Sequence, residues 1–512
     1  MQITSPTFKE NARAALADPM LQRAMGHVRA GFIDKRAAAA AALPEFDAIR
    51  DAARDIKNHT LAHLDLYLEA YEAKVRASGG EVHFAETAEG ARDIILEICR
   101  AAGAKTVTKG KSMIAEEIGL NEHLEANGIV PVETDLGEYI IQLRHEPPSH
   151  IIAPAVHAPK DKAEEDFRRV HTHLPADRDL TEPTTLLGEA RAVLRERFLA
   201  ADVGITGANF LVAETGTSVI VTNEGNGDLT QILPKVHIVI ASIEKITPTL
   251  SDVAEILRVL ARSATGQDMS CYTTFSTGPR RPGDPDGPEA YHVVILDNGR
   301  SEMLGSEFRE ALRCIRCGAC MNHCPVYQSI GGHAYGWVYP GPIGAVLTPR
   351  LIGVDQAGDL PNASTFCGRC ESVCPMRIPL PKMMRHWRER EFERRLSPAT
   401  VRTGLGVWAF FARRPRLYRT ATALAARVLG NLGFGRGRFR SLPFAGGWTK
   451  YRDPPAPEGR TFQTMWAEGQ GKGAWRRGLA GGRRRHHNGA TGARWRSGSR
   501  AMTSSGSRRS AD

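Results

Sequence analysis

Hydrophobic residues in the first 80 positions recur at helical spacing. Positions 37–42 are six consecutive alanines, the residue with the highest helix propensity. Further on, four apolar side chains fall on one face of a helix: Leu61, Leu64, Leu68 and Tyr71. The pattern predicts a helical N-terminal segment over residues 1–80 that includes an amphipathic helix running toward Gly79.

Between residues 81 and 300 short apolar runs alternate with amphipathic stretches. The runs predict strands at residues 81–84, 106–108, 129–132, 202–207, 210–215, 217–222, 237–241 and 291–296. The stretches predict helices at residues 87–101, 112–127 and 186–200, and one that begins at Thr249 with a sequence resembling a capping box. Alternation with short loops is typical of a parallel sheet with helices on its faces, so we expect an α/β domain.

Residues 301–470 have a different pattern, with helical segments and many glycines and prolines. We expect a charged helix at residues 382–396 and divide the region into parts 301–390 and 391–470. Residues 401–435 mix aromatic residues with arginines, and no apolar stretch reaches the roughly 20 residues of a membrane span. A helix lying on anionic lipid and a helix packed against a protein both fit this composition.

The positive charge of the chain is concentrated at its C-terminal end. The formal net charge is +10, and residues 461–512 hold eleven Lys or Arg and two acidic residues. The first 460 residues are therefore nearly neutral, which argues against a nucleic-acid-binding protein. Residues 471–512 are rich in Arg, Gly and Ser and poor in apolar residues, so we expect a disordered tail.

Seven of the nine cysteines occupy two short runs. The first, with Cys314, Cys317, Cys320 and Cys324, has the spacing C-x2-C-x2-C-x3-C-P of cubane iron–sulfur clusters. The second comprises Cys367, Cys370 and Cys374, also followed by proline. In two-cluster ferredoxins the last cysteine of such a run ligates the other cluster. Applied here, this rule assigns Cys314, Cys317, Cys320 and Cys374 to cluster one, and Cys324, Cys367 and Cys370 to cluster two.

Cluster two is one cysteine short of a full set. A symmetric second run would have cysteine at position 364, where the chain has Ser364. Three outcomes are open: a [3Fe–4S] cluster, a [4Fe–4S] cluster with an exchangeable or oxygen ligand, or a fourth ligand from elsewhere. Of the remaining thiols, Cys99 lies in an apolar helical run and is expected to be an ordinary buried cysteine, and Cys271 is a weak candidate ligand.

Other uses of cysteine fit the chain less well. Structural zinc needs four ligands and does not require seven cysteines with prolines after both terminal ones. The first residues lack the basic start and apolar core of an export signal, and cysteine is sparse outside the two runs. We therefore expect a cytoplasmic protein with metal-bound rather than disulfide-bonded cysteines.

Three further motifs give only weak evidence for a function. Lys109-Gly110-Lys111-Ser112 resembles the end of a phosphate-binding loop, but Lys105 stands where that loop needs glycine, so solvated lysines are expected. His171 and His173 are expected in an exposed loop. Glu214 and Glu224 border glycine-rich turns, and either could face a pocket.

Several further segments point to a known family. Residues 108–113 (TKGKSM), 135–140 (DLGEYI), 206–210 (TGANF) and 214–217 (ETGT) resemble the LUD domain of lactate-utilization proteins. Residues 331–336 (GGHAYG) and 341–344 (GPIG), with the cysteine runs, resemble the iron–sulfur subunit of that system, lactate utilization protein B. The similarity spans roughly residues 50–470. The second cysteine run of the family also lacks the extra cysteine, and the tail after about Gln470 departs from the family.

The resemblance implies a fold, a function and partners. The fold would be an α/β LUD-like domain of the sugar-isomerase and CoA-transferase type, followed by a helical ferredoxin-like domain with two [4Fe–4S] clusters. The function would be electron relay in the oxidation of L-lactate to pyruvate, as a component of a dehydrogenase complex and not a complete enzyme. Partners would be other lactate-utilization subunits and an electron donor and acceptor, proteins or quinone. The composition of residues 401–435 separately leaves open a peripheral contact at the inner face of the membrane.

Two other functions stay open on the sequence. The α/β domain could itself act on a small hydroxy or keto acid, with the clusters as its electron outlet. The chain could also be a redox-sensing binding protein. No nucleophile–base constellation or flavin fingerprint is evident in the sequence, which weighs against the first of these.

Overall fold

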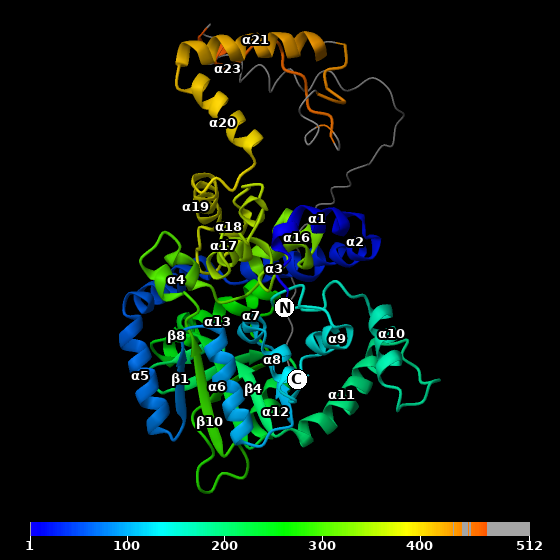
Figure 1. The fold of residues 1–512 in the computed structure, drawn as a ribbon, viewed down its shortest axis with the longest axis vertical. Helices are drawn as coiled ribbons and strands as arrows, with labels where there is room; N and C mark the ends of the chain where they lie inside the picture. Colours follow the sequence, from blue (N-terminus) through cyan, green and yellow to red (C-terminus); the bar gives the residue numbers. More distant parts are fainter. Residues whose placement is uncertain (1, 434, 443–448, 450–451, 468–512) are drawn as a thin grey trace, which may run out of the picture. The chain divides into compact units, whose positions relative to one another are not determined.

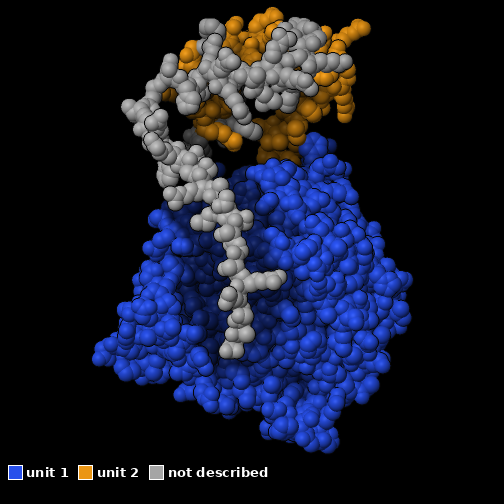
Figure 2. Space-filling model, turned by 180° about the vertical axis from the view of Figure 1, so that it is seen from behind, with its two compact units in different colours: residues 1–396 blue, residues 397–512 orange. Residues whose placement is uncertain are grey.

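A computed structural model describes residues 2–433, 435–442, 449 and 452–467. Contacts divide the chain into two units, residues 1–396 and residues 397–512, which Figure 2 colours separately. The predicted disordered tail, residues 471–512, lies outside the described residues.

A six-stranded parallel sheet forms the centre of the first unit. Its strands, in spatial order, are β1 (Glu81–Ala85), β10 (Ala290–Leu296), β7 (Val236–Ser242), β4 (Val203–Gly207), β2 (Thr106–Lys109) and β3 (Val130–Glu133). Every neighbouring pair is parallel. The parallel α/β sheet predicted from the alternating pattern is therefore confirmed.

Both faces of this sheet are covered, which explains why its strands are apolar on both sides. On β7, Ile238 and Ile240 face the core shared with helices α6 (Ala88–Ala101), α7 (Met113–Ile118) and α8 (Leu120–Ala126). Val239 and Ala241 face the opposite core, which includes α5 (Leu64–Ala77) and strand β5. Figure 1 shows α6 beside β1 and β10.

A second sheet of four strands was not predicted. Its order is β8 (Ile246–Thr247), β5 (Phe210–Val212), β6 (Thr217–Thr222) and β9 (Tyr272–Ser276). The sequence pattern missed β8 because it has only two residues, and β9 because none of its side chains is fully buried. The antiparallel pairing of β6 with β9 also joins residues about fifty positions apart, so only the folded chain reveals it.

Two predicted helices are each divided in the structure. The helix expected to contain Leu61 and Tyr71 is interrupted at His63, which separates α4 (Phe46–Ala62) from α5. The helix expected at residues 112–127 is divided at Gly119, whose positive φ of 64° ends α7.

Other helices of the α/β part can be compared with the prediction one by one. The capping box at Thr249 is present and opens α13 (Leu250–Ala264). The helix expected at residues 186–200 is α11 (Pro183–Ala200). Three helices were not predicted: α9 (Leu136–Arg144), α10 (Lys160–Val170) and α12 (Asn226–Ile232).

The cysteine-bearing part shares one core with the N-terminal helices. Its helices are α14 (Ser301–Leu304), α15 (Ala319–Asn322), α16 (Pro325–Ile330), α17 (Gly341–Leu351), α18 (Arg369–Val373) and α19 (Leu380–Glu393). The N-terminal helices are α1 (Phe8–Ala17), α2 (Pro19–Gly26) and α3 (Lys35–Ala41). Phe8 meets Tyr335 edge to face, with ring centroids 5.6 Å apart. Figure 1 shows α1 and α2 beside α16, so segments more than 300 residues apart pack together.

The second unit contains helices α20 (Ala399–Ala412), α21 (Pro415–Gly433) and α23 (Phe462–Ala467). α20 has no buried residue, although Val407, Trp408, Phe410 and Phe411 are large and apolar. Among the described residues, no helix combines the length and apolar character that a membrane crossing requires.

Candidate iron–sulfur centre and the adjoining pocket

The first cysteine run winds through two very short helices. Cys314 follows a 3-10 turn, and Gly318, with φ of 74°, begins α15. Cys324 has extended backbone and directly precedes α16, whose first residue is Pro325. Proline is favoured there because the first helical N–H needs no partner. Short helical turns and extended residues therefore alternate along the run.

The second run repeats part of this geometry. Gly368, with φ of 76°, begins α18, and Cys374 follows that helix with extended backbone. Cys370 is buried, whereas Cys367 is exposed. Glycine is needed at both helix starts because an L side chain rarely adopts such a positive φ.

Four cysteines from the two runs line a single small cavity: Cys314, Cys317, Cys320 and Cys374. We call these four residues group one. Burial and the nearby Cys374 and Cys314 thiols raise the pKa of Cys317 to about 12. Burial raises the pKa of Cys374 to about 11. Buried thiols that disfavour one another's ionisation become thiolates when a metal supplies the compensating charge, so the donor set fits an iron–sulfur cluster.

The other three cysteines, Cys324, Cys367 and Cys370, form a second set that we call group two. Burial and the neighbouring Cys324 raise the pKa of Cys370 to about 12. The pKa of Cys367 is lowered, chiefly by a hydrogen bond from the Arg369 N–H. The buried Tyr335 lies beside Cys324, and burial together with that thiol raises the pKa of Tyr335. Mutual electrostatic influence also links Cys320 of group one with Cys370, which indicates that the two groups adjoin.

The remaining candidate ligands lie elsewhere. Cys99 is buried in the core between α6 and the parallel sheet, where burial raises its pKa to about 12, as expected of an ordinary core cysteine. Cys271 is exposed and its backbone N–H donates to Asn223. Ser364 Oγ accepts a hydrogen bond from the Phe366 N–H at 3.1 Å.

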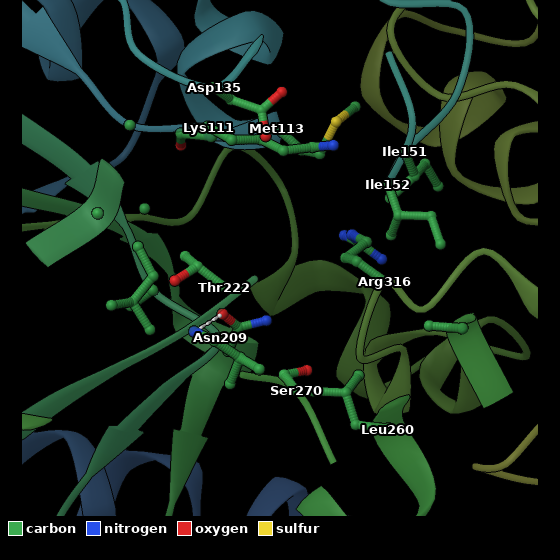
Figure 3. Close-up of a pocket in the computed structure, with 18 of the residues that line it drawn as sticks. Lys111, Met113, Asp135, Ile151, Ile152, Asn209, Thr222, Leu260, Ser270 and Arg316 are labelled. Atoms are coloured by element: carbon green, nitrogen blue, oxygen red, sulfur yellow. Dashed lines mark hydrogen bonds between the residues drawn. The ribbon is translucent and has the colours of Figure 1, made fainter. Parts of the chain in front are cut away.

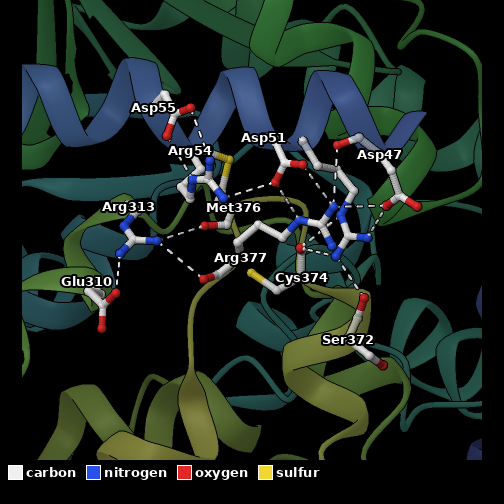
Figure 4. Close-up of polar contacts among 11 residues, drawn as sticks. Asp47, Asp51, Arg54, Asp55, Glu310, Arg313, Ser372, Cys374, Met376 and Arg377 are labelled. Carbon is white, nitrogen blue, oxygen red and sulfur yellow. Dashed lines mark hydrogen bonds and ion pairs between the residues drawn. The ribbon is translucent and has the colours of Figure 1, made fainter. Parts of the chain in front are cut away.

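Arginines from the N-terminal helices hold the second cysteine run in place, a feature that sequence reasoning missed. Arg50 on α4 donates to the carbonyl oxygens of Ser372 at 2.7 Å and of Cys374 at 2.6 Å. Arg36 on α3 donates to the Val373 carbonyl at 2.8 Å. Figure 4 shows Arg377 beside Asp47 and Asp51, with Nε 3.0 Å from Asp51 Oδ1. These cations would also offset the negative charge of a thiolate-bound cluster.

A buried ion-pair network joins the α/β part to the first cysteine run. Glu244, after β7, lies 3.2 Å from Arg300 Nε and 3.1 Å from Arg316 Nη2. Burial alone would raise the pKa of Glu244, but Arg300 and Arg316 lower it to about 2. Arg300 also pairs with Glu117 on α7 at 2.6 Å, and Glu117 accepts from the Tyr339 hydroxyl at 2.6 Å. Arg316 lies between Cys314 and Cys317 with a positive φ of 59°.

Two predictions about polar residues were wrong. Lys109 is not solvated: it is fully buried, and its Nζ lies 2.7 Å from Glu133 and 3.0 Å from Glu116. His171 is not exposed either, because its ring nitrogens contact the Tyr139 hydroxyl at 2.8 Å and Glu189 at 2.7 Å. In both cases distant carboxylates supply the partners that allow burial.

A pocket of about 250 Å³ lies where the α/β part meets the first cysteine run. Its wall includes Lys111 and Asn209, which follow strands β2 and β4, and also Arg316 (Figure 3). Cys317 lines the pocket as well. Glu224 lines it too, so one of the two glutamates considered from the sequence does face a pocket. The other, Glu214, accepts a hydrogen bond from the Leu250 N–H.

Comparison with known proteins identifies the family. A protein of Bacillus licheniformis named lactate utilization protein B is 41% identical over 480 residues, covering 92% of this chain and 98% of its own length. This chain belongs to the lactate utilization protein B family. A protein of the same name from Macrococcus caseolyticus is 42% identical over 468 residues, covering 90% of this chain and 97% of its own length. An Escherichia coli K12 relative, described as an uncharacterized electron transport protein, is 41% identical over 473 residues, with coverages of 92% and 98%.

Three domain families match successive parts of this chain. Residues 68–296 match the LUD domain, and residues 310–378 match the 4Fe-4S dicluster domain. Residues 374–470 match the family called lactate utilisation protein B, C-terminal. The dicluster match contains all seven cysteines of groups one and two, so the predicted family and its iron–sulfur character are confirmed.

Proposed function

We propose that this chain binds two iron–sulfur clusters and relays electrons from a partner to an acceptor during lactate oxidation. The observation that carries the proposal is the cavity lined by four cysteines from two distant runs, with three more cysteines beside it. Thiolate-bound clusters of this kind supply one-electron transfer when bound. The names of the relatives support lactate use and electron transport.

In this proposal group one holds a [4Fe–4S] cluster through Cys314, Cys317, Cys320 and Cys374. Group two holds a second cluster through Cys324, Cys367 and Cys370. Three thiols fit either a [3Fe–4S] cluster or a [4Fe–4S] cluster with a ligand other than cysteine. Backbone N–H groups approach the sulfurs of group one: Arg316 N lies 3.4 Å from Cys314 Sγ, and Ile378 N lies 3.5 Å from Cys374 Sγ. Such contacts stabilise thiolates and tune cluster potentials.

Helices α20 and α21 are the proposed contact surface for other components of the system. The exposed Trp408 and Phe411 are followed by four arginines: Arg413, Arg414, Arg416 and Arg419. Apolar residues beside arginines suit an anionic membrane surface. Flotation with anionic but not neutral liposomes would assign the surface to a membrane, and absence of flotation would assign it to a partner subunit.

The relay proposal is tested by purifying the protein without air and measuring iron, sulfide and paramagnetic resonance. We expect about eight irons per chain for two cubanes, or about seven if group two holds a three-iron cluster. Cys314→Ser should remove the signal of group one, and Cys324→Ser that of group two. The exposed Cys271 provides a matched control, and Cys271→Ser should keep all the iron.

Two results would contradict the proposal. If Cys314→Ser and Cys324→Ser both kept both signals, the ligand assignment would be wrong. If an iron-free preparation still supported electron transfer from lactate in a reconstituted system, the relay itself would be wrong.

A further inference from the structure

The pocket beside the first cysteine run contains charged groups that the relay does not explain. It lies at the carboxyl ends of the neighbouring strands β2 and β4, where open parallel sheets commonly bind ligands. Cys317 forms part of its wall, so the pocket reaches group one. Several segments distant in sequence build it, among them the loop after β2, the loop after β4 and the first cysteine run.

Three cationic side chains line this pocket, and two of them, Lys111 and Arg316, have buried nitrogen atoms without a partner among the described residues. Lys111 Nζ, Arg316 Nε and Arg316 Nη1 are all buried, with no hydrogen-bond acceptor among the described residues. Arg316 is only 8% exposed, and Glu244 engages its Nη2 alone. A third cation on the wall, Lys245, is 7% exposed. Leaving a buried charged donor unpaired is costly, so these groups indicate an anionic ligand.

A cluster bound at group one would account for only part of the positive charge in this pocket. Arg316 adjoins Cys317, so a cluster in group one would attract its guanidinium. Lys111 comes instead from the loop after β2, and Asn209 from the loop after β4. Asn209 Oδ1 accepts the Val221 N–H at 2.9 Å, and Figure 3 shows its amide nitrogen turned toward the pocket. Lys111 and Asn209 therefore provide donors that belong to the α/β part.

The lining limits the charge and shape of the ligand. Against the three cations stand two carboxylates, Asp135 and Glu224, so at most one positive charge is in excess, because Arg316 also pairs with Glu244. A monoanion fits this balance better than a phosphate dianion. Met113 and Ile152 supply an apolar side to the same wall.

We propose that this pocket binds a small monocarboxylate that carries a hydroxyl or keto oxygen. Lys111 and Arg316 hold the carboxylate, and the Asn209 amide donates to the second oxygen. This binding site goes beyond the relay and requires only side chains of the α/β part and the first cysteine run.

Calorimetric titration of the anaerobically purified holoprotein tests the proposal. The probes are L-lactate, pyruvate, propionate and inorganic phosphate. We expect saturable binding of lactate or pyruvate, and at least roughly tenfold weaker binding of propionate because it lacks the second oxygen. Lys111→Met should weaken binding of the hydroxy or keto acid by roughly tenfold or more, since a charge-assisted hydrogen bond is lost. Lys105→Met changes an exposed lysine of the same domain and should bind as the wild type does.

Asn209→Leu provides a second, independent variant. It should abolish the preference for lactate or pyruvate over propionate without changing the iron content. The proposal is overturned if neither lactate nor pyruvate binds, if phosphate binds more tightly than both, or if Lys111→Met and Asn209→Leu bind like the wild type. Iron and sulfide counts on the same samples separate these outcomes from a failure of the relay proposal.

Discussion

The two cysteine groups lie side by side, yet their surroundings differ. Group one has four thiols that line one small cavity, none of them fully exposed, and it adjoins the buried network of Glu244, Arg300 and Arg316. Group two has three thiols, and one of them, Cys367, is exposed. Group one is joined to the α/β part through this network, whereas group two reaches the protein surface at Cys367. Of the seven cysteines, Cys367 alone is exposed, so solvent reaches group two more readily than group one.

Metal removal should separate the two groups most clearly. We expect a chelator, added after mild oxidation without denaturant, to strip iron from group two while group one keeps its own, because Cys367 is accessible to solvent. Absorbance of the chelated iron and paramagnetic resonance of the protein follow both groups in one experiment. Equal rates of loss from the two groups would contradict the comparison.

Glu244→Gln should weaken group one and leave the ligands of group two in place. The change removes the charge between two buried arginines, and we expect it to destabilise the fold by about 3 kcal/mol. Thermal unfolding measures the loss, and a diminished or altered resonance of group one should accompany it. Glu255→Gln is the control, because Glu255 is a partly exposed residue of α13 that pairs with Arg258 at the surface. A Glu244→Gln protein as stable as this control would show that the network does not support group one.

Arg388→Ala should act on group two with a smaller effect. Arg388 Nε donates to the Pro361 carbonyl at 2.8 Å, and its guanidinium lies 4.1 Å from the centre of the Phe366 ring, next to Cys367. We expect a loss of about 1 kcal/mol in stability and faster release of iron from group two alone. The matched variant Arg385→Ala removes a largely exposed arginine of the same helix and should behave as the wild type. Faster release from group one would contradict the assignment.

Local sequence was a good guide where neighbouring residues decide the structure. The strands of the parallel sheet follow from runs such as residues 237–241, and the Thr249 capping box follows from four consecutive residues. It was a poor guide where partners come from far along the chain. Lys109 was expected in solvent because its partners Glu116 and Glu133 cannot be recognised as such before folding. The hydrogen bond from Arg50 to the Cys374 carbonyl joins residues 324 positions apart.

The same distinction between local and long-range features applies to the candidate site. The cysteine spacing alone indicated iron–sulfur chemistry, because the reach of a tight loop limits which thiols can share a metal cluster. Nothing in the local sequence pattern indicates that Lys111, Asn209 and Arg316 line one pocket, since they belong to three segments that meet only in the folded chain.

Spacing along the backbone thus determined the chemical identity of this protein, because covalent geometry fixes how near the thiols of one run can come. Burial and charge pairing were decided by the tertiary structure, because they depend on which distant groups share a region of low dielectric. The position of group one beside the buried Glu244 network, the exposure of Cys367 and the unpaired cationic nitrogens of the pocket all belong to this second kind.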